Sequence, residues 1–166
     1  MPPDPGRHHD RGMRLLLSWL GLILAAEGAE PLLKNGNFDA KDLAPWECEE
    51  GQLDRDGDNP VLAVTLDGGV FGLSQDFQWP AEIRKSTLTF RVKADQASKK
   101  SPVQLRVRLF DKEGNSAIIL TKPVQEPGKW IEVKGAVERP DFEPVNFMIE
   151  SNRGEGRLWL DDVALQ

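Results

Sequence analysis

The sequence predicts an all-β domain, an antiparallel two-sheet β-sandwich with jelly-roll topology. Three observations carry this prediction. Apolar and polar residues alternate along several short segments, turn-forming residues separate these segments, and no window of a dozen residues after residue 29 has a helical period. About ten short strands with alternating faces are typical of sandwiches and barrels. The 166 residues, 39% of them hydrophobic and 29% charged, fit one globular domain.

The alternation is clearest in residues 87–94 and 103–110. One side of each segment is apolar, with Leu88, Phe90, Val92 and Ala94 in the first and Val103, Leu105, Val107 and Leu109 in the second. Such a period of two indicates a strand with one face in the core. Further strands are expected at residues 32–38, 46–50, 61–66, 70–77, 117–120, 131–137, 145–149 and 158–165. Turn residues separate them, as at residues 67–69, 113–115 and 153–156.

The charge and the rare residues exclude several functions. The net charge of −6 argues against a nucleic-acid partner, which needs clustered Lys and Arg. The only histidines are His8 and His9, so a chain cleaved near residue 29 cannot carry out imidazole chemistry. The single cysteine, Cys48, excludes an internal disulfide. Its neighbours Glu47 and Glu49 raise a thiol pKa, so we expect a buried hydrophobic side chain and not a nucleophile.

The N-terminal segment has the pattern of a secretory signal at residues 13–29. An apolar run at residues 15–26 follows a basic residue, and small residues precede a cleavage point after Gly28 or Ala29. A run of this length is too short for an ordinary membrane span, although an uncleaved anchor is the alternative. Residues 1–12 are expected to be a mis-called start or a disordered extension. The mature domain is then residues 30–166, and its destination is the secreted, periplasmic or cell-envelope space.

Motifs at the two ends of the domain support a more specific interpretation. Residues 32–39 read Leu-Leu-Lys-Asn-Gly-Asn-Phe-Asp, Trp46 follows, and residues 158–165 read Leu-Trp-Leu-Asp-Asp-Val-Ala-Leu. This pattern resembles the carbohydrate-binding modules of cellulases and xylanases of the family 4/9/22-like type, which open on "N-G-x-F-E" and end on "I-D-D-V-x-L". The resemblance extends over nearly all of residues 32–166. It implies a jelly roll that is galactose-binding-domain-like.

The resemblance also implies a metal site. In that family the acid of the opening motif and the first acid of the closing pair hold a structural calcium, which here implies Asp39 and Asp161. Calcium accepts six to eight hard oxygen ligands in irregular geometry. The alternative is that the carboxylates at this strand end lie in solvent or pair with Lys34 or Arg157. Residues 54–59 resemble the start of an EF-hand loop but lack its later ligands, so a solvated hairpin loop is favoured there.

A ligand-binding groove is predicted on one sheet face. Arg106 and Arg108 lie two residues apart, so they share a strand face at a spacing of about 6.7 Å, close to the repeat of one sugar ring. Together with Glu150 they could hydrogen-bond vicinal hydroxyls. Trp79, before Pro80, is expected at the rim of the groove as a stacking surface, or else as a cap on the end of the sandwich. An ordinary solvated sheet face is the alternative, since sugar clefts normally present Trp and Tyr and this chain has no Tyr.

The function predicted from the sequence is a secreted, non-catalytic carbohydrate-binding module that holds a polysaccharide or glycan. No acid stands in a recognisable catalytic context, so the protein is not expected to be an enzyme. An envelope protein or a secreted glycoside hydrolase is a possible partner. The alternative is a protein-interaction or adhesion β-sandwich of the cell envelope with no sugar ligand.

Overall fold

The computed structural model describes residues 30–95, 102–151 and 154–166, which form nine strands. The predicted start extension and signal, residues 1–12 and 13–29, lie outside the described residues. Within the described part of the chain, no helix is long and apolar enough to cross a membrane. The strands are β1 (Gly51–Asp56), β2 (Asn59–Asp67), β3 (Phe71–Asp76), β4 (Lys85–Ala94), β5 (Gln104–Phe110), β6 (Ser116–Pro123), β7 (Ile131–Glu138), β8 (Asn146–Ser151) and β9 (Glu155–Leu165).

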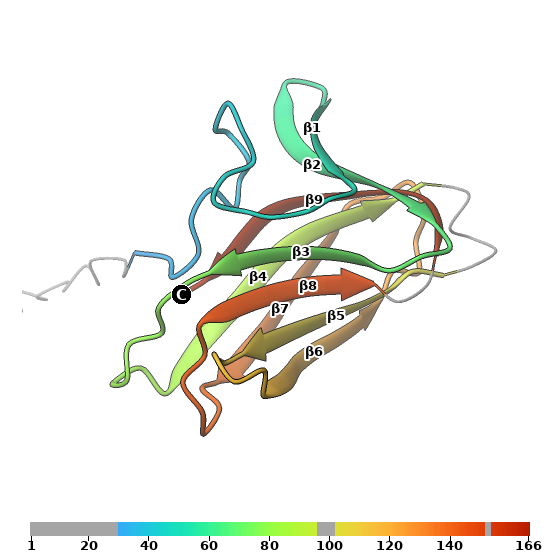
Figure 1. The fold of residues 1–166 in the computed structure, drawn as a ribbon. Helices are drawn as coiled ribbons and strands as arrows, with labels where there is room; N and C mark the ends of the chain where they lie inside the picture. The colour runs from blue at the N-terminus through green and yellow to red at the C-terminus, as the bar shows by residue number, and fades with distance from the viewer. Residues whose placement is uncertain (1–29, 96–101, 152–153) are drawn as a thin grey trace, which may run out of the picture.

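The strands form two sheets that face each other (Figure 1). The five-stranded sheet has the order β1-β2-β9-β4-β7, and the four-stranded sheet has the order β3-β8-β5-β6. Every strand pair is antiparallel. Neighbours in each sheet are mostly distant in sequence, as a jelly roll requires. The fold class predicted from the sequence, an antiparallel two-sheet sandwich, is confirmed.

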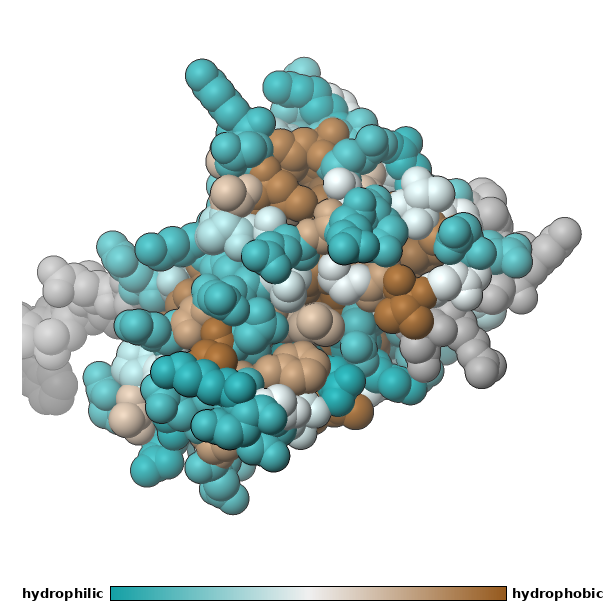
Figure 2. Space-filling model, viewed as in Figure 1, coloured by the Kyte–Doolittle hydropathy of each residue, from teal (hydrophilic) through white to brown (hydrophobic). Residues whose placement is uncertain are grey.

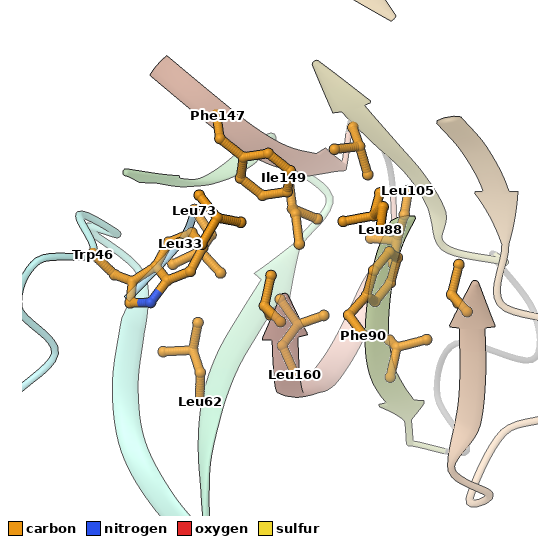
Figure 3. Packing of buried hydrophobic residues seen from close by; sticks show 14 of the residues in the cluster. Leu33, Trp46, Leu62, Leu73, Leu88, Phe90, Leu105, Phe147, Ile149 and Leu160 are labelled. Carbon is orange, nitrogen blue, oxygen red and sulfur yellow. The ribbon is translucent and has the colours of Figure 1, made fainter. Parts of the chain in front are cut away.

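The core lies between the two sheets and contains the residues that the alternation placed inward. Leu88, Phe90 and Val92 of β4 and Leu105, Val107 and Leu109 of β5 are each no more than 1% exposed. Figure 3 shows Phe90, Leu105, Phe147 and Ile149 converging from opposite sheets. In β4, β5 and β8 a buried residue alternates with a more exposed one, so the residues between the core positions lie on the outer faces of the sandwich. Strand β2 differs, because Val61 to Val64 are all buried and both of its faces are covered there.

The two N-terminal strands expected from the sequence are absent. Residues 32–38 are bends and turns, and residues 46–50 contribute a single bridge, between Glu47 and Ser74. In residues 32–38 the physical reason is a left-handed backbone at Asn35 (φ 51°) and Phe38 (φ 55°), which an extended strand cannot contain. The apolar residues that suggested strands are nevertheless buried, because the segment folds against the end of the sandwich.

Residues 54–59 form a tight hairpin and not the start of an EF-hand helix pair. Asp56 pairs with Asn59 across a turn in which Gly57 has a φ of 67°, a value that glycine adopts readily. The strand β1 was not predicted, because its acidic residues read as a loop. In Figure 1 this hairpin projects from the upper edge of the sandwich beside the loop that precedes it.

Candidate functional site

The outward side chains of the four-stranded sheet form a grid of three rows, because the strand registers align them. Each row crosses β3, β8, β5 and β6 in turn. Neighbouring strands lie about 4.8 Å apart, and rows about 6.7 Å apart. The rows are Asp76, Asn146, Phe110 and Ser116; then Ser74, Met148, Arg108 and Ile118; then Gly72, Glu150, Arg106 and Thr121. We call this grid the outer face. Figure 2, in the orientation of Figure 1, shows hydrophilic residues over much of this side, with apolar residues between them.

Arg108 is held in place at the centre of the outer face. Its Nη2 donates a hydrogen bond to Ser116 Oγ at 2.7 Å, and its Nη1 lies 3.6 Å from Glu150 Oε1. The guanidinium also lies over the ring of Phe110, 4.9 Å from the centroid. Three residues on three strands therefore fix one arginine, and this arginine in turn orients Glu150. The structure thus brings Arg108 and Glu150 together, as the sequence predicted.

Arg106 lies directly opposite Glu150 in the strand register, but its guanidinium is uncommitted. Among the described residues, none forms an ion pair or a side-chain hydrogen bond with Arg106. Glu150 pairs instead with Arg108, one row away. Arg106 is half-buried among its neighbours. It presents a planar fork of five N–H donors at a sheet surface beside a carboxylate, which is the geometry that recognises polar ligands in a bidentate manner.

The expectation that Trp79 stands exposed at the rim is wrong. Trp79 is only 4% exposed, packs against Phe77 at 6.2 Å between ring centroids, and donates its indole N–H to the carbonyl of Ile83 at 2.9 Å. The turn that follows Pro80 folds back and supplies that acceptor. Trp79 therefore caps the end of the sandwich, which was the alternative interpretation, and cannot stack on a ligand.

Two other tryptophans lie on the opposite side of the molecule. Trp159 alternates with buried residues of β9 and points away from the core, and Trp130 immediately precedes β7. Both are half-buried. Lys93 Nζ lies 5.1 Å from the Trp130 ring centroid and 5.0 Å from that of Trp159. Arg91 lies over the first ring at 4.8 Å and Arg157 over the second at 5.4 Å.

This cation–indole row, made of Arg91, Trp130, Lys93, Trp159 and Arg157, anchors the β1–β2 hairpin. The indole N–H of Trp159 is bonded to Asp54 and that of Trp130 to Asp56. Hydrogen bonds from the Arg55 backbone and then Trp159 lower the pKa of Asp54. Hydrogen bonds from Lys93 and then Trp130 lower the pKa of Asp56. Because the indoles already face cations and their N–H groups are committed, the row is a structural clamp.

No described contact joins the two predicted calcium ligands, Asp39 and Asp161. Asp39 is exposed and accepts a hydrogen bond from Asn37. Asp161 is 1% exposed, and its oxygens accept hydrogen bonds from Asn59, Arg91 and the backbone N–H of Asp162. A carboxylate surrounded by donors, one of them a guanidinium, does not fit a calcium ligand. Among the described residues, no group of three or more His, Cys, Asp or Glu side chains is arranged to hold a metal. Calcium binding stays a prediction.

Two hollows lie in the described surface, and neither is lined by Arg106, Arg108 or Glu150. A larger one, of about 620 Å³, separates the N-terminal segment from the end of β9 and is lined in part by Asn37 and Asp162. A smaller one, of about 380 Å³, lies between the edge strands β6 and β7.

The side chain of Cys48 lines neither hollow. Burial first, and the charge of Glu50 second, raise the pKa of its thiol to about 11. The thiol is therefore protonated at neutral pH, as expected.

Comparison with known proteins identifies the class. The model of the family described as a carbohydrate binding domain matches residues 30–156. Because this match covers most of the chain, the protein belongs to that family and is a carbohydrate-binding module. The resemblance stated from the two end motifs is confirmed. A comparison with curated protein sequences finds no significant match.

Solved structures of carbohydrate-binding modules share the fold. TmCBM61, solved in complex with β-1,4-galactotriose, superposes with a TM-score of 0.63 at 16% identity, over 83% of this chain and 99% of that one. The xylan-binding CBM22-1 domain of Xyn10C from Paenibacillus barcinonensis gives 0.58 at 16% identity, over 79% and 90%. A CBM4 structure gives 0.55 at 17% identity, over 80% and 97%. At these identities the likeness shows the fold alone.

Proposed function

We propose that this domain is a secreted, non-catalytic module that holds a polysaccharide on the outer face of the four-stranded sheet. The observation that carries the proposal is the cluster of Arg106, Arg108 and Glu150, side by side on adjacent strands at the spacing of a sugar ring. Arg106 and Glu150 are the ligand-contacting groups. Arg108 is a positioning residue, because its own donors already hold Ser116 and Glu150.

The geometry of the outer face favours binding over hydrolysis. Glycoside hydrolysis uses two carboxyl groups about 5–10 Å apart. The carboxylates at the described outward positions of this sheet belong to Glu150 and Asp76. They stand on neighbouring strands and two rows apart, which is about 13 Å along the strand. Glu150 is also ion-paired with Arg108. Because of this separation and this ion pair, Glu150 and Asp76 are not placed to act as the acid and the nucleophile on one glycosidic bond.

Affinity electrophoresis and titration calorimetry of residues 30–166 against a polysaccharide panel test the proposal. The panel includes a β-1,4-galactan and a xylan, the ligand classes of the modules with this fold. Binding is expected to be weak, with Kd of roughly 0.1–1 mM, because each solvent-exposed contact contributes only about 1 kcal/mol. Arg106→Ala should weaken binding about fivefold or more and leave the melting temperature nearly unchanged.

Arg84→Ala is the matched control, since Arg84 is exposed and lies outside the outer face. Equal affinities for the two variants would remove the outer face from the function. If no polysaccharide binds at all, the protein-interaction or adhesion sandwich becomes the better interpretation. Export is tested separately: expression of the full chain should release a protein whose N-terminus is at residue 29 or 30.

A further inference from the structure

Around Arg106 and Arg108 the outer face holds several hydrogen-bond donors that have no described partner. A guanidinium offers five N–H groups and accepts nothing. All five groups of Arg106 lack a partner among the described side chains, and the Nε of Arg108 is buried without an acceptor. The carboxylate nearest to these donors is that of Glu150, and it already pairs with Arg108. A ligand that fits this face must therefore bring acceptors.

The outer face also offers little aromatic surface to a neutral sugar. Neutral pyranoses gain much of their affinity by stacking C–H groups on an exposed ring. At the described outward positions of the four-stranded sheet the one aromatic residue is Phe110, and the guanidinium of Arg108 lies over its ring. Trp79 is buried, and the indoles of Trp130 and Trp159 lie on the other sheet. Affinity has to come from hydrogen bonds that are strengthened by charge.

We propose that the ligand is a polysaccharide with carboxylate groups, that is, one that contains uronic acid units, and that Arg106 binds the carboxylate. This inference rests on the proposed function and names its substrate class. A carboxylate accepts hydrogen bonds only, and its two oxygens match the guanidinium fork. Glu150, held by Arg108, accepts hydrogen bonds from hydroxyls of the same or the next sugar. The net charge of −6 opposes general adsorption of polyanions, so such binding requires a local cationic site.

The test compares polymers that differ only in charge. Polygalacturonate and its fully methyl-esterified form share sugar and linkage, and alginate and glucuronoxylan are each compared with their carboxyl-reduced forms. We expect at least one free acid to bind at least tenfold more tightly than its uncharged counterpart. Arg106→Gln should reduce this ratio to near one, and Arg106→Lys should retain part of it, because a point charge replaces a fork. Arg84→Gln, an exposed control, should leave the ratio unchanged.

The outcomes separate the two proposals. If neutral polymers bind as tightly as charged ones and Arg106→Gln weakens both alike, the polysaccharide function stands and the uronate inference is overturned. If a free acid is preferred but Arg106→Gln and Arg84→Gln behave identically, the assignment to Arg106 is overturned. Dextran sulfate tests for unspecific attraction of polyanions. If the domain binds dextran sulfate as tightly as the best polyuronate, the uronate inference is overturned. If no polymer binds, both proposals fail.

Discussion

The indole N–H of Trp130 donates a hydrogen bond to Asp56 Oδ2 at 2.6 Å, and this contact joins residues 74 positions apart. Asp56 ends β1 at the tip of the hairpin, and Trp130 stands at the start of β7, the opposite edge strand of the same sheet. Lys93, on the strand between them, bonds the other oxygen of Asp56 at 2.8 Å. The hairpin is thus held against the outside of the five-stranded sheet by a contact that spans the sheet.

Asp56→Ala should destabilise the domain. The substitution leaves a half-buried indole N–H and the ammonium of Lys93 without their acceptor. Since the side chain of Asp56 is 41% exposed, we expect a loss at the low end for such contacts, about 1–2 kcal/mol, or a melting temperature lower by a few degrees. Asp58→Ala is the control, because its carboxylate lies in the same turn and bonds no described residue. Equal melting temperatures for the two variants would show that the clamp contributes nothing.

The same clamp predicts a pH dependence. The pKa values of Asp54 and Asp56 are lowered in the folded state, mainly by hydrogen bonds. Groups of this kind stabilise the fold above their ordinary pKa of about 3.9 and lose that contribution as the pH falls through the lowered folded value. Unfolding in urea should therefore show stability falling between about pH 5 and pH 2. The double variant Asp54→Asn/Asp56→Asn should be less stable than the parent at pH 7, and its stability should fall less steeply as the pH is lowered. If the stability of the parent and of the double variant falls by the same amount over this pH range, the pH dependence does not come from Asp54 and Asp56.

Much of the fold could be predicted because β4, β5 and β8 each have one buried and one more exposed face. In β4 and β5 the period of two identified both the strand and its inward residues. The period fails where the backbone departs from extension. Leu33 and Phe38 are both buried, but they are five positions apart, which does not fit a period of two, and the left-handed Asn35 turns the chain between them. In β6, a register shift opposite Val107 and Arg108 leaves Ile119 and Leu120 both half-buried, which blurs the alternation.

The site was predictable to the extent that it depends on strand faces. Period two placed Arg106, Arg108 and Glu150 outward, and all three lie on one face. The anchor of Arg108 was missed, because the alignment of Ser116 with β5 depends on the register shift in β6. Trp79 was misplaced for a different reason. Its N–H is satisfied by a carbonyl four residues later, in a turn, and no alternation pattern reports such a contact.

Gly36→Ala should be severely destabilising, because the opening motif approaches β9 too closely for a side chain. A Cβ at position 36 would stand 1.8 Å from the carbonyl oxygen of Val163, while the Val163 N–H bonds the Gly36 carbonyl at 2.9 Å. Both contacts involve backbone, so relief requires separating the motif from the sheet. We expect a loss of about 2–4 kcal/mol. Gly72→Ala is the matched change, since its Cβ would meet Met148 at an ordinary 3.7 Å, and should stay within about 0.5 kcal/mol of the parent.

Trp79→Ala should affect stability and not ligand binding. The side chain is buried at the end of the sandwich with its N–H bonded, so its removal creates a cavity and costs about 3–5 kcal/mol. Trp79→Phe keeps most of the volume and should cost less. For the variant that remains folded, the affinity for any polysaccharide bound by the parent should be unchanged in calorimetry. A large loss of affinity in folded Trp79→Phe would return this residue to the binding site.

The last prediction concerns the closing motif and calcium. The resemblance implies that Asp161 holds a calcium ion, whereas the contacts of its carboxylate, to Asn59 and Arg91, imply a structural hydrogen-bond network. Burial is the main cause of a raised pKa at Asp161, so ionisation already costs stability in the folded state. Asp161→Asn removes that cost together with the charged contact to Arg91. The net loss should therefore be small, about 1 kcal/mol, and the same in EDTA as in millimolar calcium.

Thermal melts of the parent and of Asp161→Asn, each with EDTA and with calcium, decide between the two accounts. An ion that binds only the folded state adds about 2.7 kcal/mol at a hundredfold excess over its Kd, which raises the melting temperature by several degrees. If calcium produces such a rise in the parent and Asp161→Asn cancels it, the carboxylate must exchange Arg91 for the metal, and the network account is wrong. Asp39→Asn, at an exposed position that contacts neither Asn59 nor Arg91, separates the cases further. If Asp161 belongs only to the hydrogen-bond network, Asp39→Asn should leave the melting temperature unchanged in EDTA and in calcium. If both acids share an ion, Asp39→Asn should reduce the rise in melting temperature that calcium produces.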